Sequence, residues 1–184
     1  MRNFYPSLLS LTLSIFVAGC AALGTKANLS GKVDSDSFRK VALVITKQKT
    51  SNPSIDRRVD SLLVKEVLSQ LSGLKPTPQV AFIGDADELL GNTELRNNLV
   101  TSYTTLLHVE IALSYNGALG GDNGYNSWVR MQAFKIPEKQ SLGDTKFNTQ
   151  MGKTYTKRPT LQESIHDGVT GAFGPWAKKI SQRL

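Results

Sequence analysis

The chain has 184 residues, a hydrophobic content of 40% and a formal net charge of +7. This composition excludes a disordered chain, and the single cysteine excludes internal disulfide bonds and a metal site built from several thiolates. A basic surface suits anionic neighbours such as membranes or acidic polysaccharide, although charges that only keep the surface soluble are an equal alternative.

Residues 1–20 have the organisation of a signal peptide: Arg2, an apolar run over residues 8–17, and a small-residue cleavage site at Ala18-Gly19. The run is too short for a membrane-spanning helix, which needs roughly 20 apolar residues. We therefore expect residues 1–19 to be removed. An ordinary secreted protein is the alternative, but it would keep Cys20 as an unpaired thiol in an oxidising compartment.

The sequence Val17-Ala18-Gly19-Cys20 resembles the lipobox of bacterial lipoproteins. This resemblance implies diacylglycerol on the Cys20 thiol and a fatty acid such as palmitate on its amino group. Residues 21–37 are small and polar, so residues 20–37 are expected to form an acylated cysteine and a flexible tether of about 20–25 Å. Ala21 in place of aspartate implies, by the enterobacterial sorting rule, the periplasmic face of the outer membrane, where nucleic acid is no partner.

Residues 38–46 form a compact apolar run typical of a buried strand, and residues 79–83 form a second one. Between them, Asn52-Pro53 predicts the start of a helix whose apolar residues recur at helical spacing up to Gly73. Residues 85–100 predict either one helix or two short helices, because Gly91-Asn92 interrupts the pattern.

From Thr104 the apolar period changes to two, which predicts a strand over residues 104–115 and a second around residues 128–134. A glycine-rich hairpin loop is expected between them, then a turn over residues 137–143 and a polar edge strand over residues 147–155. Thr160 and Glu163 form a capping box that begins a final helix, which Gly174-Pro175 is expected to break or kink.

This element order predicts one periplasmic domain over residues 38–184. Its fold class is α/β (α+β), with a mixed sheet of about five strands, helices packed on it, and the order β-α-β-α-β-β-β-α. The first two strands are expected to be parallel, because a helix joins them, and the later hairpins antiparallel.

The lipobox, the tether, the strands VALVI, QVAFI and TLLHVEIALSY, and the terminal helix together resemble the small periplasmic domain of several bacterial lipoproteins. These include the curli-secretion channel lipoprotein, the lipoprotein activator of penicillin-binding proteins and the Pel polysaccharide export lipoprotein, all related in fold to the amino-terminal domain of TolB. The resemblance implies assembly by binding. The extra membrane-spanning hairpins of the curli channel have no counterpart here, which disfavours a pore formed by this chain alone.

The sequence offers no motif for catalysis. His108 and His166 have no partner at metal-ligand spacing, no G-x-S-x-G nucleophile elbow occurs, and the glycine-rich loop joins two strands without a phosphate-binding motif. We therefore expect a non-enzymatic protein that has neither a cofactor nor a metal.

Two groups of residues are candidate contact sites. Trp176 with Lys178, Lys179 and Arg183 has the chemistry of an interfacial helix at a bilayer; the favoured alternative places Phe173 and Trp176 in the core and the charges in solvent. Basic residues on the late strands are candidates for binding a partner: Lys135, Lys139, Lys146, Lys153, Lys157 and Arg158.

The first functional hypothesis is a lipid-anchored component of an envelope secretion or polysaccharide-export machine, which binds an envelope protein, self-associates and contacts an anionic polysaccharide. The alternative is a lipoprotein regulator that docks one-to-one on a cell-wall synthase. A hydrolase is the least supported hypothesis.

Overall fold

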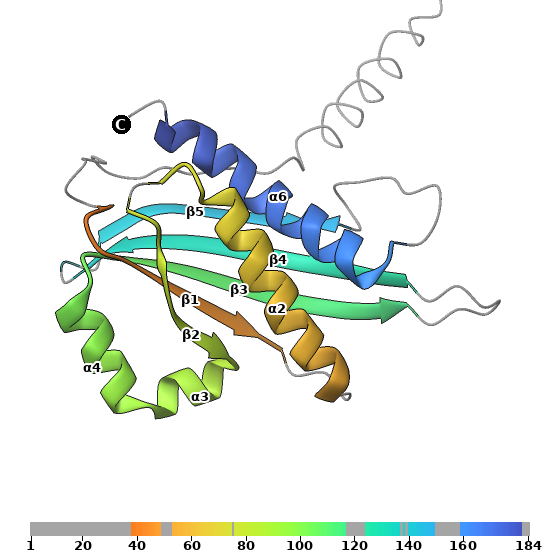
Figure 1. Cartoon of the computed structure of the whole chain (residues 1–184), viewed down its shortest axis with the longest axis horizontal. Helices are drawn as coiled ribbons and strands as arrows, with labels where there is room; N and C mark the ends of the chain where they lie inside the picture. The colour runs from red at the N-terminus through yellow and green to blue at the C-terminus, as the bar shows by residue number, and fades with distance from the viewer. Residues whose placement is uncertain are drawn as a thin grey trace, which may run out of the picture.

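Figure 1 shows the chain as a computed structural model, which describes residues 38–48, 53–74, 76–116, 124–136, 138, 140–149 and 159–181. The elements in chain order are β1 (Val41–Lys47), α2 (Pro53–Gln70), β2 (Gln79–Gly84), α3 (Ala86–Gly91), α4 (Thr93–Ser102), β3 (Thr105–Asn116), β4 (Gly124–Lys135), β5 (Gln140–Asn148) and α6 (Leu161–Ser181). Within these ranges no helix is long and apolar enough to cross a bilayer.

The five strands form one mixed sheet in the order β2-β1-β3-β4-β5. Strand β1 pairs in parallel with both β2 and β3, whereas β3, β4 and β5 pair in antiparallel fashion. The predicted fold class is confirmed. Residues 85–100 form two helices, because the Asn92 side chain accepts a hydrogen bond from the backbone N–H of Leu95 at 2.9 Å and so begins a new helix.

Helices α2 and α6 lie side by side across one face of the sheet (Figure 1). The main hydrophobic core fills the space between them and the strands, and it includes Leu43, Leu107, Met131 and Trp176, each 0% exposed. These strand residues alternate with residues that point to the other face, as a pleated strand requires.

Helices α3 and α4 cover the other face of the sheet beside β1, β2 and the start of β3, where Leu106 packs against the same cluster. Ala42 and Val44 of β1 pack there with Leu99 of α4, and partly buried apolar residues surround them. Strand β1 is therefore covered on both faces, which explains its nearly continuous apolar sequence.

The last strand begins earlier than predicted. Strand β5 covers residues 140–148, so most of the predicted turn belongs to the strand, whereas residues 150–155 of the predicted strand lie outside the described residues. The reason is an irregularity in the β4–β5 pairing beside Ala133, after which Leu142 and Thr145 both face α6. Two inward residues three positions apart do not show the period of two that marks a strand in a sequence.

The capping box of the last helix is confirmed. The Thr160 N–H donates to the Glu163 carboxylate at 2.8 Å, and the Glu163 N–H donates to the Thr160 hydroxyl at 3.2 Å. Of the two outcomes expected at Gly174-Pro175, a break or a kink, the break does not occur, because the helix runs through Pro175 to Ser181. Burial of Phe173 and Trp176 on either side of the proline offsets the hydrogen bond that the proline removes.

Two glycines allow α6 to lie close to the sheet. A Cβ atom on Gly168 would overlap the side chains of Ser127 and Val129, and one on Gly171 would overlap the ring of Phe147. A Cβ atom on Gly174, in the same helix, would meet no heavy atom within 4 Å apart from its chain neighbours and the backbone of its own helix.

We predict that Gly168→Ala and Gly171→Ala each lower the free energy of unfolding by about 1–3 kcal/mol, because the added methyl group overpacks the interface between α6 and the sheet. Gly174→Ala is the control and should stay within about 0.5 kcal/mol of the wild type, since its gain in helix propensity is offset by crowding against Pro175. Denaturant unfolding measures all three. Equal stability of the three variants would contradict this account of the interface.

Candidate functional site

Among the described elements, α6 covers one face of the half of the sheet formed by β3, β4 and β5, while on the other face α3 and α4 reach only its edge, at Leu106 near the start of β3. The hydrophobic cluster under α3 and α4 contains no residue of β4 or β5, and Figure 1 shows both helices beside β2. We call the surface left there the open sheet face. Its residues, which lie opposite one another in the strand register, are His108, Glu110, Ala112, Trp128, Arg130, Gln132, Asp144 and Lys146.

His108 lies on this face next to β1. Its Nε2 atom is 2.8 Å from the hydroxyl of Thr46, a residue that is 3% exposed. Burial lowers the pKa of His108 below its usual value, although Glu110 opposes the shift. The imidazole therefore serves as a neutral hydrogen-bonding partner in the sheet.

Arg130 and Asp144 form a two-pronged ion pair across β4 and β5. The Arg130 Nε atom is 3.2 Å from Oδ1 of Asp144, and Nη2 is 3.1 Å from Oδ2. The hydrogen bonds that Arg130 donates to the Asp144 carboxylate raise the pKa of Arg130. With Glu110 and Lys146 beside this pair, the charges of the open sheet face nearly cancel.

An apolar groove adjoins the open sheet face where α4 meets the ends of β3 and β4. Its volume is about 490 Å³, and two of its residues are unusually exposed: Leu90 at 63% and Val100 at 55%. Arg96 and Lys135 are the charged residues of its lining. The full lining is Leu89, Leu90, Arg96, Leu99, Val100, Leu106, Phe134, Lys135 and Ile136.

The sequence contained one indication of this groove. Leu89-Leu90 and Leu99-Val100 are pairs of adjacent apolar residues, and one member of each pair must turn away when the other faces the sheet. In the structure Leu99 is buried in the cluster and Val100 is exposed. The pattern of residues 85–100 by itself predicts helices and not a groove, so the groove was not predicted.

A second hollow, which we call the basic pocket, lies at the end of the sheet where β1 and β2 begin and α4 ends. Its volume is about 340 Å³. Backbone hydrogen bonds fix this end of the sheet, because the carbonyl of Lys40 accepts from Thr104 at 2.9 Å and that of Thr104 accepts from Ile136 at 2.8 Å. The lining of the pocket is Arg39, Lys40, Val41, Pro76, Thr77, Gln79, Ser102 and Tyr103.

The structure corrects one membrane-contact candidate. Trp176 is 0% exposed and packs edge-to-face on Phe38, with ring centroids 6.3 Å apart. Its indole therefore belongs to the core, as the alternative interpretation held, and cannot reach a bilayer from this position. Cys20, Arg183 and the side chains of Lys178 and Lys179 lie outside the described residues.

The basic candidates on the late strands are not all gathered in one place. Lys135 lines the apolar groove and lies 3.9 Å from the Glu138 carboxylate. Lys146 lies opposite Arg130 in the register, and Lys135 opposite Gln140, so the two lysines are about 20 Å apart along β5 at the usual rise per residue. The remaining candidates lie outside the described residues: Lys139, Lys153, Lys157 and Arg158.

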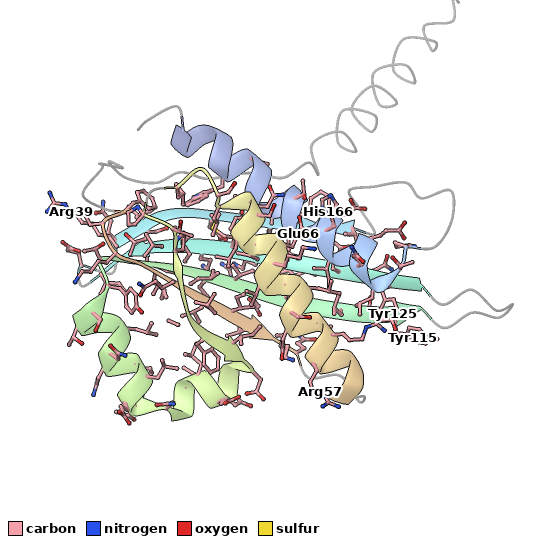
Figure 2. The ribbon with its side chains drawn as sticks, in the orientation of Figure 1. Arg39, Arg57, Glu66, Tyr115, Tyr125 and His166 are labelled. Carbon is pink, nitrogen blue, oxygen red and sulfur yellow. The ribbon has the colours of Figure 1, made fainter. Side chains whose placement is uncertain are left out.

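His166 lies on the outer surface between the two main helices. Figure 2 shows it beside Glu66 of α2, and its Nδ1 atom is 2.8 Å from the Glu66 carboxylate. Since the partner comes from another helix, this histidine joins α2 to α6. The part of the chain that the structure describes contains no cluster of His, Cys, Asp and Glu side chains suited to a metal ion.

The lowered pKa of His108 predicts a loss of stability in acid. In the unfolded chain His108 binds a proton near pH 6.5, whereas in the folded protein it binds one only at lower pH. The free energy of unfolding therefore falls as the pH drops below about 6.5 towards the lowered pKa. We predict that His108→Gln, which keeps a polar side chain, loses less stability than the wild type between about pH 7.5 and pH 5. Urea unfolding at the two pH values measures this, and equal losses in the two proteins would contradict it.

Comparison with known proteins gives no family assignment. No protein-family model matches the chain, and no curated protein sequence matches it. A PelC dodecamer from Paraburkholderia phytofirmans aligns with a TM-score of 0.46 and 13% identity, covering 82% of this chain and 96% of the PelC chain. A PelC variant dodecamer from the same organism aligns with a TM-score of 0.47 and 12% identity, covering 82% of this chain and 94% of the PelC chain. A putative neuraminyllactose-binding hemagglutinin homolog from Helicobacter pylori aligns with TM-score 0.40 and 12% identity over 85% and 96%. At these scores the similarities establish no common function.

Proposed function

We propose that this protein is a lipoprotein anchored by acylated Cys20 to the periplasmic face of the outer membrane, where it acts by binding as a component of an envelope secretion or polysaccharide-export assembly. One observation carries the proposal: the only cysteine of the chain directly follows Val17-Ala18-Gly19, and an apolar run over residues 8–17 precedes that sequence. An anchor of this kind confines a small domain to the membrane surface, where its partners are also confined.

The apolar groove supports a role in binding another protein. Leu90 and Val100 expose apolar surface next to the half-buried Phe134, and the charged residues of the lining are both cations. Exposed apolar surface of this kind marks interaction sites in soluble domains. The chemistry fits a protein segment with apolar side chains flanked by carboxylates, supplied by an envelope protein or by a second copy of this chain.

The open sheet face extends the same surface. Trp128, Arg130 and Gln132 are partly exposed, and Arg130 is paired with Asp144. A partner in the groove could therefore spread over β3, β4 and β5 without leaving the charge of Arg130 both buried and unpaired, which would be costly. The working mode is binding, and no catalytic step is part of this proposal.

We predict that Cys20→Ala abolishes acylation and releases the protein from the membrane fraction, because the thiol is the attachment point of the lipid. The measurements are mass analysis of the mature wild-type protein from its native host and membrane fractionation of the variant. The domain over residues 38–184 should keep its stability. A wild-type protein that carries no acyl chain, or a variant that stays with the membrane, would refute the anchor.

We predict that the double variant Leu90→Asp and Val100→Asp dissociates the native assembly, because two buried carboxylates in an apolar contact cost several kcal/mol, about 2 or more for each. The measurement is the apparent size of the complex extracted in mild detergent from the native host. The control adds the same charges to exposed positions of α2, as Ser61→Asp and Ser69→Asp. An assembly of unchanged size in the groove variant, with membrane fractionation intact, would show that the groove is not the contact.

A further inference from the structure

We propose that the basic pocket binds the carboxylate-bearing sugar residues of an anionic polysaccharide. The inference rests on the proposed function in one respect, since a polymer of this kind is within reach only if the protein works in the envelope. The pocket lies at the end of the sheet where β1 begins, and Figure 2 labels Arg39 there.

The lining of the pocket has the charge of an anion site. Arg39 and Lys40 supply two cationic side chains, and the lining includes no aspartate or glutamate. A guanidinium forms two parallel hydrogen bonds with a carboxylate, and an ammonium adds a compact charge. The two residues are adjacent in sequence, at the entry to a strand whose backbone is buried, so their backbone positions are well fixed.

Hydrogen bonds hold the pocket in shape before a ligand arrives. The N–H of Lys40 donates to the Thr104 hydroxyl at 3.1 Å, and the Lys40 carbonyl accepts from the N–H groups of Thr104 and Thr105. The Tyr103 hydroxyl donates to Oε1 of Gln79 at 3.3 Å, which turns the amide nitrogen of Gln79 away from Tyr103. A site whose groups are already placed loses less entropy on binding.

The remaining groups favour a sugar acid over a small inorganic anion. The hydroxyls of Thr77 and Ser102 and the amide of Gln79 offer donors and acceptors for sugar hydroxyls, while Val41 and Pro76 supply apolar contacts. The volume of about 340 Å³ is at the lower end of the range for small-molecule sites, about 300–1,000 Å³, and exceeds what one phosphate would fill. These features fit one uronate residue seated in the pocket while the polymer continues past it.

The test uses the full chain purified in detergent, with oligogalacturonate as the probe and a neutral dextran oligomer and inorganic phosphate as comparison ligands. We expect oligogalacturonate to bind, in a salt-dependent manner, and the other two to bind at least about tenfold more weakly. Lys40→Gln should weaken oligogalacturonate binding about tenfold, and Arg39→Gln with Lys40→Gln should abolish it. Calorimetry measures the affinities, and circular dichroism checks that each variant is folded.

Arg57→Gln is the matched control, because it removes one exposed positive charge at the start of α2, well away from Arg39 (Figure 2). It should change the affinity by less than about twofold. Equal weakening by Arg57→Gln and Lys40→Gln would overturn the proposal in favour of attraction by net charge, and equal affinity for phosphate would overturn it in favour of a general anion site. Absence of oligogalacturonate binding would overturn it too, and would leave the anchor, which is tested by fractionation of Cys20→Ala, untouched.

Discussion

The burial of β1 on both faces is the constraint on which the rest of the structure depends. The side chains from Val41 to Ile45 are at most 2% exposed. A parallel strand between two neighbours needs cover on both sides, and the chain supplies it with α2 and α6 on one face and α3 and α4 on the other. Because α3 and α4 are short and are used beside β1 and β2, the antiparallel half of the sheet receives one layer of helices. The candidate surfaces lie at this boundary.

The three surfaces differ in charge, and this difference suggests a division of roles. On the open sheet face, Arg130 is satisfied by Asp144 and the neighbouring charges balance, so the face presents a nearly neutral polar surface. The apolar groove exposes Leu90 and Val100 and suits a protein contact. The basic pocket combines two cations with uncharged polar groups, which suits an anion. In the proposals made above, a protein partner and a charged polymer would bind at separate positions of one small domain, so that neither would need to displace the other.

Much of the fold could be predicted, because the local sequence specifies where several of its elements begin and which type they are. The capping box at Thr160 and Glu163 specifies the start of α6, and the alternation after Thr104 specifies β3. The prediction failed where tertiary contacts override local pattern. The start of strand β5 was misplaced because an irregular pairing hides its period, and α6 runs through Pro175 because residues on both sides of it are buried in the core. Trp176 and its basic neighbours have the residue types of a membrane contact, but the Trp176 side chain packs in the core against Phe38.

The sequence by itself determined the order of the elements, the mixed sheet and the parallel pairing of β1 with β2, because periodicity and the connecting helix constrain them locally. Only the tertiary structure decided which faces are covered. Periodicity shows which side chains share a face, but another element, distant in the chain, decides whether that face is buried. This is why Val100 turned out to be exposed, and why Lys40, Gln79 and Tyr103, which come from three separate segments, line one pocket.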